Sequence, residues 1–371
     1  MTRRRALAAL AVLSFALAAG SIWWLTRKPL SFESRASRTA EQAPLVLQPA
    51  PDPSDAAALV GDDPESDDTP LDLPAEVIEQ IQIERAPTPA FRRTENYLLV
   101  GVDRTWGRSF GRADSMVVVV FDDDTGHVGV ISIPRDLYVD VPGHGPARIN
   151  ATLRIGGRIG QNPLTLASRV VSDTLVMPIH HVMVGDLSSF ERTVDRLGGV
   201  EVEVACPIAD NFIDPRTEDG RRILDVDAGR RHMDGVTAAM YVRSRHGRSD
   251  LDRARRQQTV LLGLRDRVRG LSATEWIPIL SDAMDEGVTT TMSRLEMIGL
   301  GRRVASVEPG RLHGILIGSR QVEAHRTEEG RAVLLPNYDA IDRALGRLFE
   351  APAPGTRPEH SRCQPKDAAL R

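Results

Sequence analysis

The clearest structural signal in the chain lies in residues 113–133, ADSMVVVVFDDDTGHVGVISI. It contains two apolar runs rich in β-branched residues, 116–121 and 128–133, which are typical of buried strands. The segment DDDTG at 122–126 is a turn signal between them. We therefore expect an antiparallel hairpin, in which the start of the first strand and the end of the second lie at the same edge of the sheet.

The sequence on either side of this hairpin alternates between strand-like and helical patterns. Strand-like runs recur at residues 97–102, 200–204 and 314–317. Residues 188–191, SSFE, form a capping-box pattern that predicts a short helix ending at Gly198–Gly199. Continuous apolar strands among amphipathic helices indicate a sheet that is covered on both faces. We expect an α/β fold, with a three-layer α/β/α domain and a central mixed sheet over residues 91–352.

Composition narrows the class of protein. The 371 residues are 41% hydrophobic and 26% charged, an ordinary globular mixture. The formal net charge is −4, which excludes a nucleic-acid binder that relies on overall basicity. Only Lys28 and Lys366 are lysines, so almost every cationic side chain is an arginine. The two cysteines are too few for a zinc site with four thiolate ligands.

The amino terminus carries a targeting signal. Residues 6–26 contain no charge, and 21 residues of helix rise about 31 Å, close to the hydrocarbon thickness of a bilayer. Arginines 3–5 precede this run and favour a cytoplasmic amino terminus. We favour a retained single-pass anchor over residues 1–28, while a signal peptide cleaved near Ala16–Ala18 is the alternative. In both cases the rest of the chain lies outside the cytoplasm.

The flanks of the expected domain are polar. Residues 29–90 are rich in Pro, Ala, Asp and Glu and are expected to form a mostly disordered linker, in which a short helix can form at 75–85. Residues 353–371 form a second Pro-rich tail. An exported chain can join Cys206 to Cys363 in a disulfide, worth roughly 4–5 kcal/mol in the chain-entropy model. Two unrelated buried thiols are the alternative.

Charged residues gather at one end of the predicted hairpin. Asp114 precedes its first strand, and Arg135 and Asp136 follow its second. Asp103 ends the preceding strand, so we expect it at the same edge. Asp103 and Asp114 could supply hard oxygen ligands to Mg²⁺. The alternative is that these aspartates cap strand ends and turns.

Residues 241–258, YVRSRHGRSDLDRARRQQ, hold six arginines in eighteen positions. Arg253 and Gln257 stand at the start of the core-facing stripe of a predicted helix, where long polar side chains need a partner. A phosphate anion near the helix amino terminus would provide one, because a guanidinium binds phosphate oxygens bidentately. A solvated basic face paired with Asp250 and Asp252 is the alternative. Nucleic acid is not an expected partner, because interleaved aromatic residues are absent from this segment.

Seven segments together resemble the LytR-CpsA-Psr (LCP) family. In order they are NYLLVGVD (96–103), RADSM (112–116), SIPRD (132–136), RINAT (148–152), RLGGVEVEV (196–204), HMDGVTAAMYVRSR (232–245) and DLDRARRQQ (250–258). The similarity is strongest over residues 93–270. It implies an enzyme that transfers glycopolymers from a polyprenyl-pyrophosphate carrier to peptidoglycan. One departure is Asp252, where the family often has glycine, and this carboxylate could engage Arg253 or Arg256.

The resemblance also implies roles for individual residues. Asp103 and Asp114 match the family's metal ligands, with Mg²⁺ or Mn²⁺ as the cofactor. The pyrophosphate-binding arginines match Arg135, Arg243, Arg245 and Arg253, and further polar site residues match Arg112 and Gln257. Asp136 matches an acidic residue of the same motif.

The implied reaction is attack of an acceptor sugar hydroxyl on the phosphorus next to the glycan, leaving a phosphodiester link. Arg135 and Arg253 would stabilise the developing charge, and Asp136 could accept the hydroxyl proton. The prenyl chain would need an apolar tunnel, expected along the helix after Gln258 (Val260, Leu261 and Leu264) and the sheet. Two alternatives remain open: a polyprenyl-pyrophosphate hydrolase, and a noncatalytic envelope protein that binds polyprenyl lipids. The expected location is the cell membrane, with the domain on its outer side.

Overall fold

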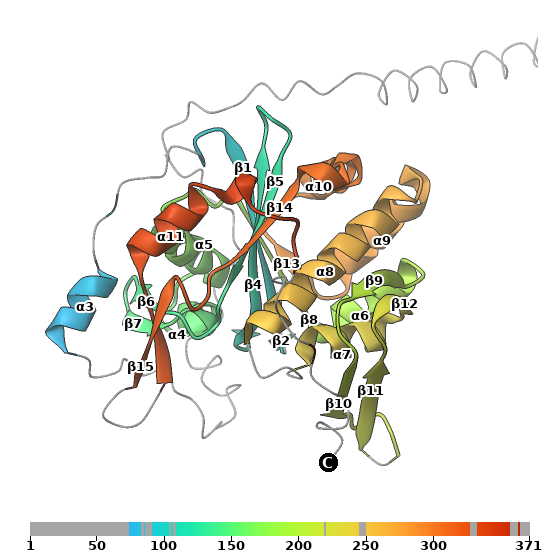
Figure 1. Cartoon of the computed structure of the whole chain (residues 1–371), viewed down its shortest axis with the longest axis horizontal. Coiled ribbons are helices and arrows are strands. Elements are labelled where there is room, and N and C mark those ends of the chain that lie inside the picture. Colours follow the sequence, from blue (N-terminus) through green and yellow to red (C-terminus); the bar gives the residue numbers. More distant parts are fainter. Residues whose placement is uncertain are drawn as a thin grey trace, which may run out of the picture. The chain divides into compact units, whose positions relative to one another are not determined.

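The predicted hairpin is the centre of the computed structural model (Figure 1). Strands β4 (Ala113–Asp122) and β5 (Val128–Ile133) pair antiparallel, with Met116 opposite Ile133 and Phe121 opposite Val128. Gly126 has a φ of 70°, the left-handed conformation that a tight turn requires of one residue. The hairpin and its turn are therefore formed as the sequence predicts.

The hairpin is part of a six-stranded mixed sheet with the order β13-β8-β1-β4-β5-β14. The other four strands are β1 (Thr94–Val102), β8 (His181–Asp186), β13 (Val288–Thr290) and β14 (Leu312–Leu316). β1 pairs antiparallel with β4 and parallel with β8, and β14 pairs parallel with β5. As a result β1, β5, β8 and β14 all end at the edge of the sheet where β4 begins.

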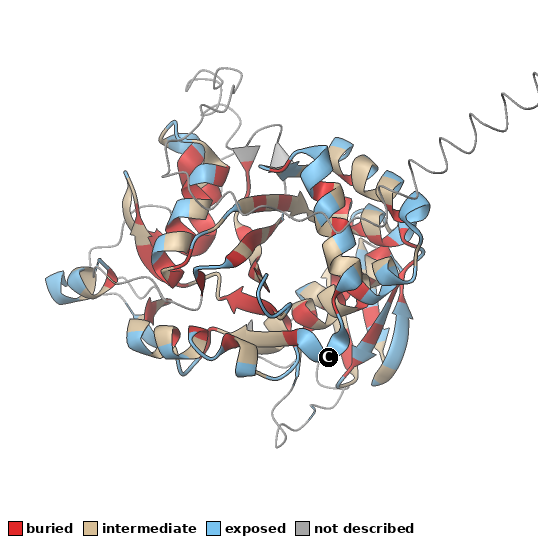
Figure 2. Cartoon of the chain, turned by 90° about the horizontal axis from the view of Figure 1, so that it is seen from above, coloured by how far each residue is buried: buried red, intermediate tan, exposed pale blue. Residues whose placement is uncertain are grey.

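Helices cover both faces of this sheet, as expected (Figures 1 and 2). One face packs against α4 (Thr152–Arg158), α5 (Pro163–Leu175) and α11 (Tyr338–Leu345); the other packs against α8 (Asp250–Arg269), α9 (Ala273–Asp285) and α10 (Arg294–Ser306). Side chains alternate along the strands, so Leu98 and Val100 enter the first core while Tyr97 enters the second. The result is an α/β fold with two hydrophobic cores on one mixed sheet.

A further cluster forms around smaller sheets. It involves α6 (Leu187–Arg196), α7 (Gly235–Arg243) and the strand pairs β9 (Val200–Val204) with β12 (Gly229–Met233) and β10 (Ile208–Ile213) with β11 (Arg221–Val226). The capping-box prediction at 188–191 is displaced, because the side chain of Asp186 caps α6 by accepting from Ser189 N–H at 2.8 Å. The helix ends before Gly198 and Gly199 as predicted, and both have positive φ angles.

Short elements complete the described part of the chain. They are α3 (Ala75–Ile81), β2 (Thr105–Trp106), β3 (Ser109–Phe110), β6 (Tyr138–Val141), β7 (Gly145–Arg148), β15 (Val322–Arg326), β16 (Ala332–Pro336), and the 3-10 turns η2 (Ile149–Ala151), η3 (Pro309–Arg311) and η4 (Leu348–Glu350). Ile81 of α3 is buried with Tyr138 and Val333. The short helix of the predicted linker is thus docked on the folded domain.

The structure describes residues 74–82, 85, 91–103, 105–106, 109–218, 220–244, 250–326, 332–356 and 363. Within these ranges, no helix combines the length and the apolar character needed to cross a bilayer. The predicted anchor and most of the predicted linker lie outside them and stay predictions.

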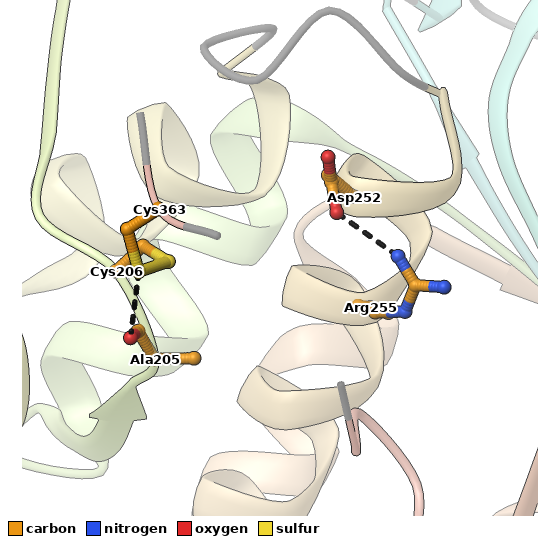
Figure 3. The surroundings of a disulfide bond; sticks show 5 residues. All are labelled: Ala205, Cys206, Asp252, Arg255 and Cys363. Carbon is orange, nitrogen blue, oxygen red and sulfur yellow. Dashed lines mark hydrogen bonds and ion pairs between the residues drawn. A yellow bond between two sulfur atoms is a disulfide. The ribbon is translucent and has the colours of Figure 1, made fainter. Parts of the chain in front are cut away.

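The predicted link between the two cysteines is present in the structure. A disulfide joins Cys206, two residues after the end of β9, to Cys363, with a Cα–Cα distance of 5.4 Å (Figure 3). The first residues of the predicted tail also pack on the domain, since a Cβ on Gly314 of β14 would lie 2.5 Å from Cα of Pro354. The carboxyl-terminal segment is therefore attached at both β14 and β9.

Candidate functional site

The edge where four strands end and β4 begins carries the predicted carboxylates. Asp103 directly follows β1, and Asp114 is the second residue of β4. The pairing of Val102 with Ala113 brings these two aspartates to the same end of adjacent strands. Arg135 follows β5 by two residues and reaches Asp114, with Nη1 donating to Oδ1 at 3.0 Å. Ligands of open α/β sheets bind at such an edge, beyond the carboxyl ends of strands.

A cavity of about 350 Å³ opens at this edge. Four predicted site residues line it together: Asp114, Arg135, Arg253 and Gln257. Ser115 and Ser132 add hydroxyl groups to the same wall. The charged residues among the described lining are two arginines and one aspartate. Such a cavity suits an anion.

Most of the remaining cavity wall is apolar. Its apolar described residues are Ile133, Pro134, Leu251, Ala254, Ile317, Val322, Ala324 and Leu334, and Gly318 and Ser319 complete the described lining. Val322 and Leu334 come from the β15–β16 hairpin, which joins the segment after β5 where the N–H of Leu334 donates to the carbonyl of Asp136 at 3.1 Å. Val260, Leu261 and Leu264 are not among the described lining residues, and Val260 is buried in the cluster around β9. Of the predicted apolar lining, the sheet contributes Ile133 of β5, while the three α8 residues do not contribute and the β15–β16 hairpin adds Val322 and Leu334.

Arg135 is held by two carboxylates and still has an unused donor. Its Nη1 bonds Asp114, and its Nε lies 3.5 Å from Oδ2 of Asp136. The Nε atom is buried, and among the described residues none offers it a hydrogen bond of normal geometry. A guanidinium is thus fixed at the cavity with one N–H unsatisfied, which is costly unless a ligand accepts from it.

Asp136 acts on Arg135 rather than on the cavity. It lies between Arg135 and Arg148, whose Nε is 4.0 Å from its Oδ1. Asp136 is not among the described residues that line the cavity. This geometry supports a positioning role for Asp136, and its expected role as proton acceptor stays a prediction.

Helix α8 brings its amino-terminal turns over the cavity. Arg253 is 5% exposed, so its charge is almost wholly withdrawn from water. Gln257, one turn later, accepts a hydrogen bond from the hydroxyl of Ser115 at 3.0 Å. The helix approaches the sheet closely because a Cβ on Gly318 would lie 2.5 Å from Cδ2 of Leu251. Arg253 and Gln257 therefore face the same space as Arg135, as predicted.

The neighbouring arginines of α8 have structural partners. Asp252 forms an ion pair with Arg255 at 2.9 Å (Figure 3). Arg256 is buried and donates to the backbone carbonyls of Tyr241 and Ser244, at the end of α7. Burial lowers the pKa of Arg256 from its usual value. Arg256 thereby satisfies carbonyls that the end of α7 leaves without helical partners.

The remaining predicted arginines are less closely tied to the cavity. Arg243, the last residue of α7, is exposed and its Cζ lies 5.4 Å from the ring centroid of Phe212. Arg112 precedes β4 by one residue and is partly buried. Neither is among the described lining residues. Arg245 lies outside the described residues.

The donor set at the edge fits Mg²⁺ only in part. Within the described part of the chain, no group of three or more His, Cys, Asp or Glu residues is arranged to hold a metal ion. Mg²⁺ is commonly bound by one or two carboxylates together with water and substrate phosphate oxygens, which Asp103 and Asp114 could provide. Asp114 already pairs with Arg135, and its side chain remains 44% exposed. The pair therefore suits an ion that arrives with a phosphate ligand.

Sequence reasoning missed part of this site. Ser115 and Ser132 lie inside two of the quoted segments, RADSM and SIPRD, so their position beside charged site residues was the available signal. Val322 and Leu334 had no such signal, because a hairpin distant in sequence brings them to the cavity.

Comparison with known proteins identifies the family of this chain. The model of the LytR_cpsA_psr family matches residues 72–346. The chain belongs to the LytR-CpsA-Psr family. Among curated relatives, it is 30% identical over 197 residues to the polyisoprenyl-teichoic acid–peptidoglycan teichoic acid transferase TagT of Bacillus subtilis. That match covers 53% of this chain and 58% of TagT.

Solved structures of this family share the fold. The crystal structure of Bacillus subtilis TagV is 23% identical, with a TM-score of 0.56 over 70% of this chain and 98% of TagV. A structure of the family protein YwtF (TagT) with bound octaprenyl pyrophosphate lipid is 22% identical, with a TM-score of 0.50 over 73% and 95% of the two chains. At these identities the likeness describes the fold of this LytR-CpsA-Psr protein.

Proposed function

We propose that this protein is a phosphotransferase that moves a glycopolymer from a polyprenyl-pyrophosphate carrier to peptidoglycan. The observation that carries the proposal is the meeting of Arg135 and Arg253, with Asp114, in one cavity whose remaining described lining is mostly apolar. The family membership and the teichoic acid transferases among the relatives support the same reaction class.

The polar side of the cavity has the chemistry for a pyrophosphate group. Two guanidinium groups can share the non-bridging oxygens of both phosphates, and Arg135 offers an unsatisfied N–H for this purpose. Because Arg253 is almost fully buried, its attraction for an anion is weakly screened by water. The side-chain amide of Gln257 stands beside them.

The apolar side suits the first isoprene units of the carrier. Ile317, Val322 and Leu334 form a wall next to the arginines. Each CH₂ group that leaves water for such a wall is worth about 0.8 kcal/mol. A lipid with a charged head and an apolar chain therefore matches both parts of the cavity.

The transfer is a displacement at the phosphorus next to the glycan. An acceptor sugar hydroxyl forms the new P–O bond, its proton passes to solvent, and the bond to the polyprenyl phosphate breaks with both electrons going to the leaving oxygen. Arg135 and Arg253 stabilise charge on the non-bridging oxygens and on the departing phosphate. These groups act mainly by position and charge.

The proposal includes a divalent cation and an extracytoplasmic location. Asp103 and Asp114 would hold Mg²⁺ or Mn²⁺, which when bound neutralises phosphate charge. The uncharged run at residues 6–26 would anchor the chain in the membrane, with the described domain outside the cytoplasm near its lipid substrate.

The proposal is tested with the purified full-length chain, a labelled polyprenyl-pyrophosphate-linked glycan and peptidoglycan. We expect label in the peptidoglycan and release of polyprenyl phosphate, with loss of both in Asp114→Asn. Asp124→Asn is the matched control, since Asp124 lies in the exposed turn at the other end of β4 and pairs with Arg93 at 3.2 Å.

Two outcomes would overturn the transferase. Release of phosphate without label in the peptidoglycan would show a hydrolase. Binding of the carrier without turnover, and full cellular function of Asp114→Asn, would show a noncatalytic lipid-binding protein. Addition of EDTA, followed by Mg²⁺, tests the cation separately.

A further inference from the structure

Gln258 is a second glutamine in α8 that lies next to the cavity without lining it. Its side chain is 1% exposed. A carboxamide buried to this degree is costly unless all its polar groups are bonded. The partners of Gln258 therefore indicate what it holds in place.

Every strong hydrogen-bonding group of this side chain reaches a different element. Its Nε2 donates to the hydroxyl of Ser132 on β5 at 3.0 Å and to the carbonyl of Ile315 on β14 at 3.1 Å. Its Oε1 accepts from the N–H of Gly355 in the carboxyl-terminal segment at 2.8 Å. One residue of α8 is thus tied to two neighbouring strands of the sheet and to the chain segment after η4.

The fit around this side chain is tight. A Cβ on Gly314 would lie 2.5 Å from Cα of Pro354 and 3.0 Å from Oε1 of Gln258. The carboxyl-terminal segment therefore lies directly on β14 and leaves the carboxamide of Gln258 little room to move. Gln257 makes the parallel connection to β4 through Ser115 at 3.0 Å.

We propose that Gln258 is a positioning residue for the proposed transfer: it fixes the amino-terminal turns of α8 against β5 and β14, and so sets Arg253 opposite Arg135. Arg253 lies five residues before Gln258 on the same rigid helix, so a shift or rotation of α8 moves its guanidinium directly. Ser132 links this contact to the cavity, since it both accepts from Gln258 and lines the wall. The inference rests on the proposed function and names a residue that acts through other residues.

The test compares Gln258→Leu with Leu224→Ala in the full-length chain. Leucine has a similar volume and removes all three hydrogen bonds. Leu224 is 1% exposed on β11, in the cluster that also holds Val260 of α8, so its truncation destabilises the protein but leaves the hydrogen bonds of Gln258 to β5 and β14 in place. Both variants are assayed at temperatures where circular dichroism shows them fully folded.

Three quantities are measured for each variant. We expect kcat for transfer to fall about 10- to 100-fold in Gln258→Leu, since misplacement by about 1 Å can cost this much. The KM for the lipid carrier should change less than about threefold, because the apolar wall is unaltered. The Kd for inorganic pyrophosphate, measured by calorimetry, should rise about 3- to 10-fold. Leu224→Ala should leave all three within about twofold.

The outcomes separate this inference from the proposed function. If folded Gln258→Leu has the same kcat and pyrophosphate Kd as Leu224→Ala, the positioning role is overturned. If Gln258→Leu does not fold, Ser132→Ala is measured in its place, because it removes one of the hydrogen bonds of Gln258. The expected decrease in kcat and in pyrophosphate binding is then smaller. A third outcome is that the wild-type chain binds pyrophosphate, that Gln258→Leu weakens this binding, and that no glycan is transferred. This outcome would support the positioning role of Gln258 and contradict the proposed transferase activity. If the wild type does not bind pyrophosphate, both the positioning role and the proposed transferase activity are contradicted.

Discussion

Arg135 and Arg303 lie at opposite ends of the central hairpin, and their side chains are almost equally exposed, at 23% and 25%. Both contact two carboxylates. Arg303 hydrogen-bonds Glu95 and Asp123, and its Cζ stands 4.3 Å from the ring centroid of Phe121. Arg135 hydrogen-bonds only one of its carboxylates in good geometry and keeps a buried Nε without an acceptor among the described residues.

The difference lies in charge balance. At the turn end, two carboxylates surround one arginine, and His181 adds a contact to Glu95 at 3.4 Å. At the cavity end, the described lining has two arginines for one carboxylate. Arg303 is therefore hydrogen-bonded to both of its carboxylates, while Arg135 at the cavity keeps a buried Nε without an acceptor among the described residues. We expect the arginine at the turn end to contribute to the stability of the fold and the arginines at the cavity end to contribute to activity.

The largest expected effect is loss of transfer on removing a cavity arginine. Arg135→Gln and Arg253→Gln should each lower kcat about 10²- to 10³-fold, because a fixed cationic donor to the reacting phosphates is lost. Label transfer to peptidoglycan measures this. Arg169→Gln is the control, since Arg169 is 66% exposed on α5. Equal activity of all three variants would contradict the assignment of the cavity.

The reverse pattern is expected at the turn end. Arg303→Gln leaves Glu95 and Asp123 without their shared cation and should lower the free energy of unfolding by about 2–3 kcal/mol, less than for a fully buried pair. Its kcat should stay within about twofold of the wild type. Urea denaturation measures the first quantity. An unchanged free energy of unfolding, or a loss of transfer activity, would contradict the proposed difference between the two ends of the hairpin.

Acid stability provides a further measure of the turn end. The hydrogen bond from His181, and then the charge of Arg303, lower the pKa of Glu95 to about 2 from 4.5. Below pH 4.5 the unfolded chain therefore binds a proton that the folded chain does not, and stability falls as the pH drops from about 4.5 to about 2. The loss should be at most about 2 kcal/mol, since this side chain is partly exposed and screened. Urea titrations across this range should show a shallower decline for Glu95→Gln; an identical slope would contradict the prediction.

The smallest effect is expected at Asp136. Asp136→Asn keeps an acceptor beside Arg135 but removes the charge, so kcat should fall about tenfold while the pH–rate profile keeps its shape. If Asp136 were instead the general base, its acidic limb would disappear from the profile. This measurement separates positioning from proton transfer.

Much of the site could be predicted because local patterns place it. The turn at 122–126 between two apolar runs is enough to predict β4 and β5, and hence that Asp114 and Arg135 share an edge. The helical period from Arg253 to Gln257 predicts that both lie on one face of α8. These relations depend only on strand pairing and helix geometry. The family resemblance added the chemistry.

The partners of the charged side chains were not predictable in the same way. Asp136 is adjacent to Arg135 in sequence, yet Arg148, from another segment, stands on its other side. Nothing in the local pattern distinguishes Arg253, which lines the cavity, from Arg256, which bonds the end of α7. The partner of each charged side chain depends on which backbone carbonyl or charged group lies within hydrogen-bonding distance, about 3 Å, after folding.

The amino-acid sequence alone determined the hairpin, the course of α8, the two cysteines available for a bridge and the family. Period, turn chemistry and capping act over a few residues, so they can be read directly. The tertiary structure decided that Val322 and Leu334 line the cavity, that Gln258 joins α8 to β5 and β14, and that Arg303 bonds two carboxylates while Arg135 keeps a buried Nε without an acceptor among the described residues. Those outcomes depend on contacts between segments far apart in the chain, where packing and charge neutralisation act only after the fold has formed.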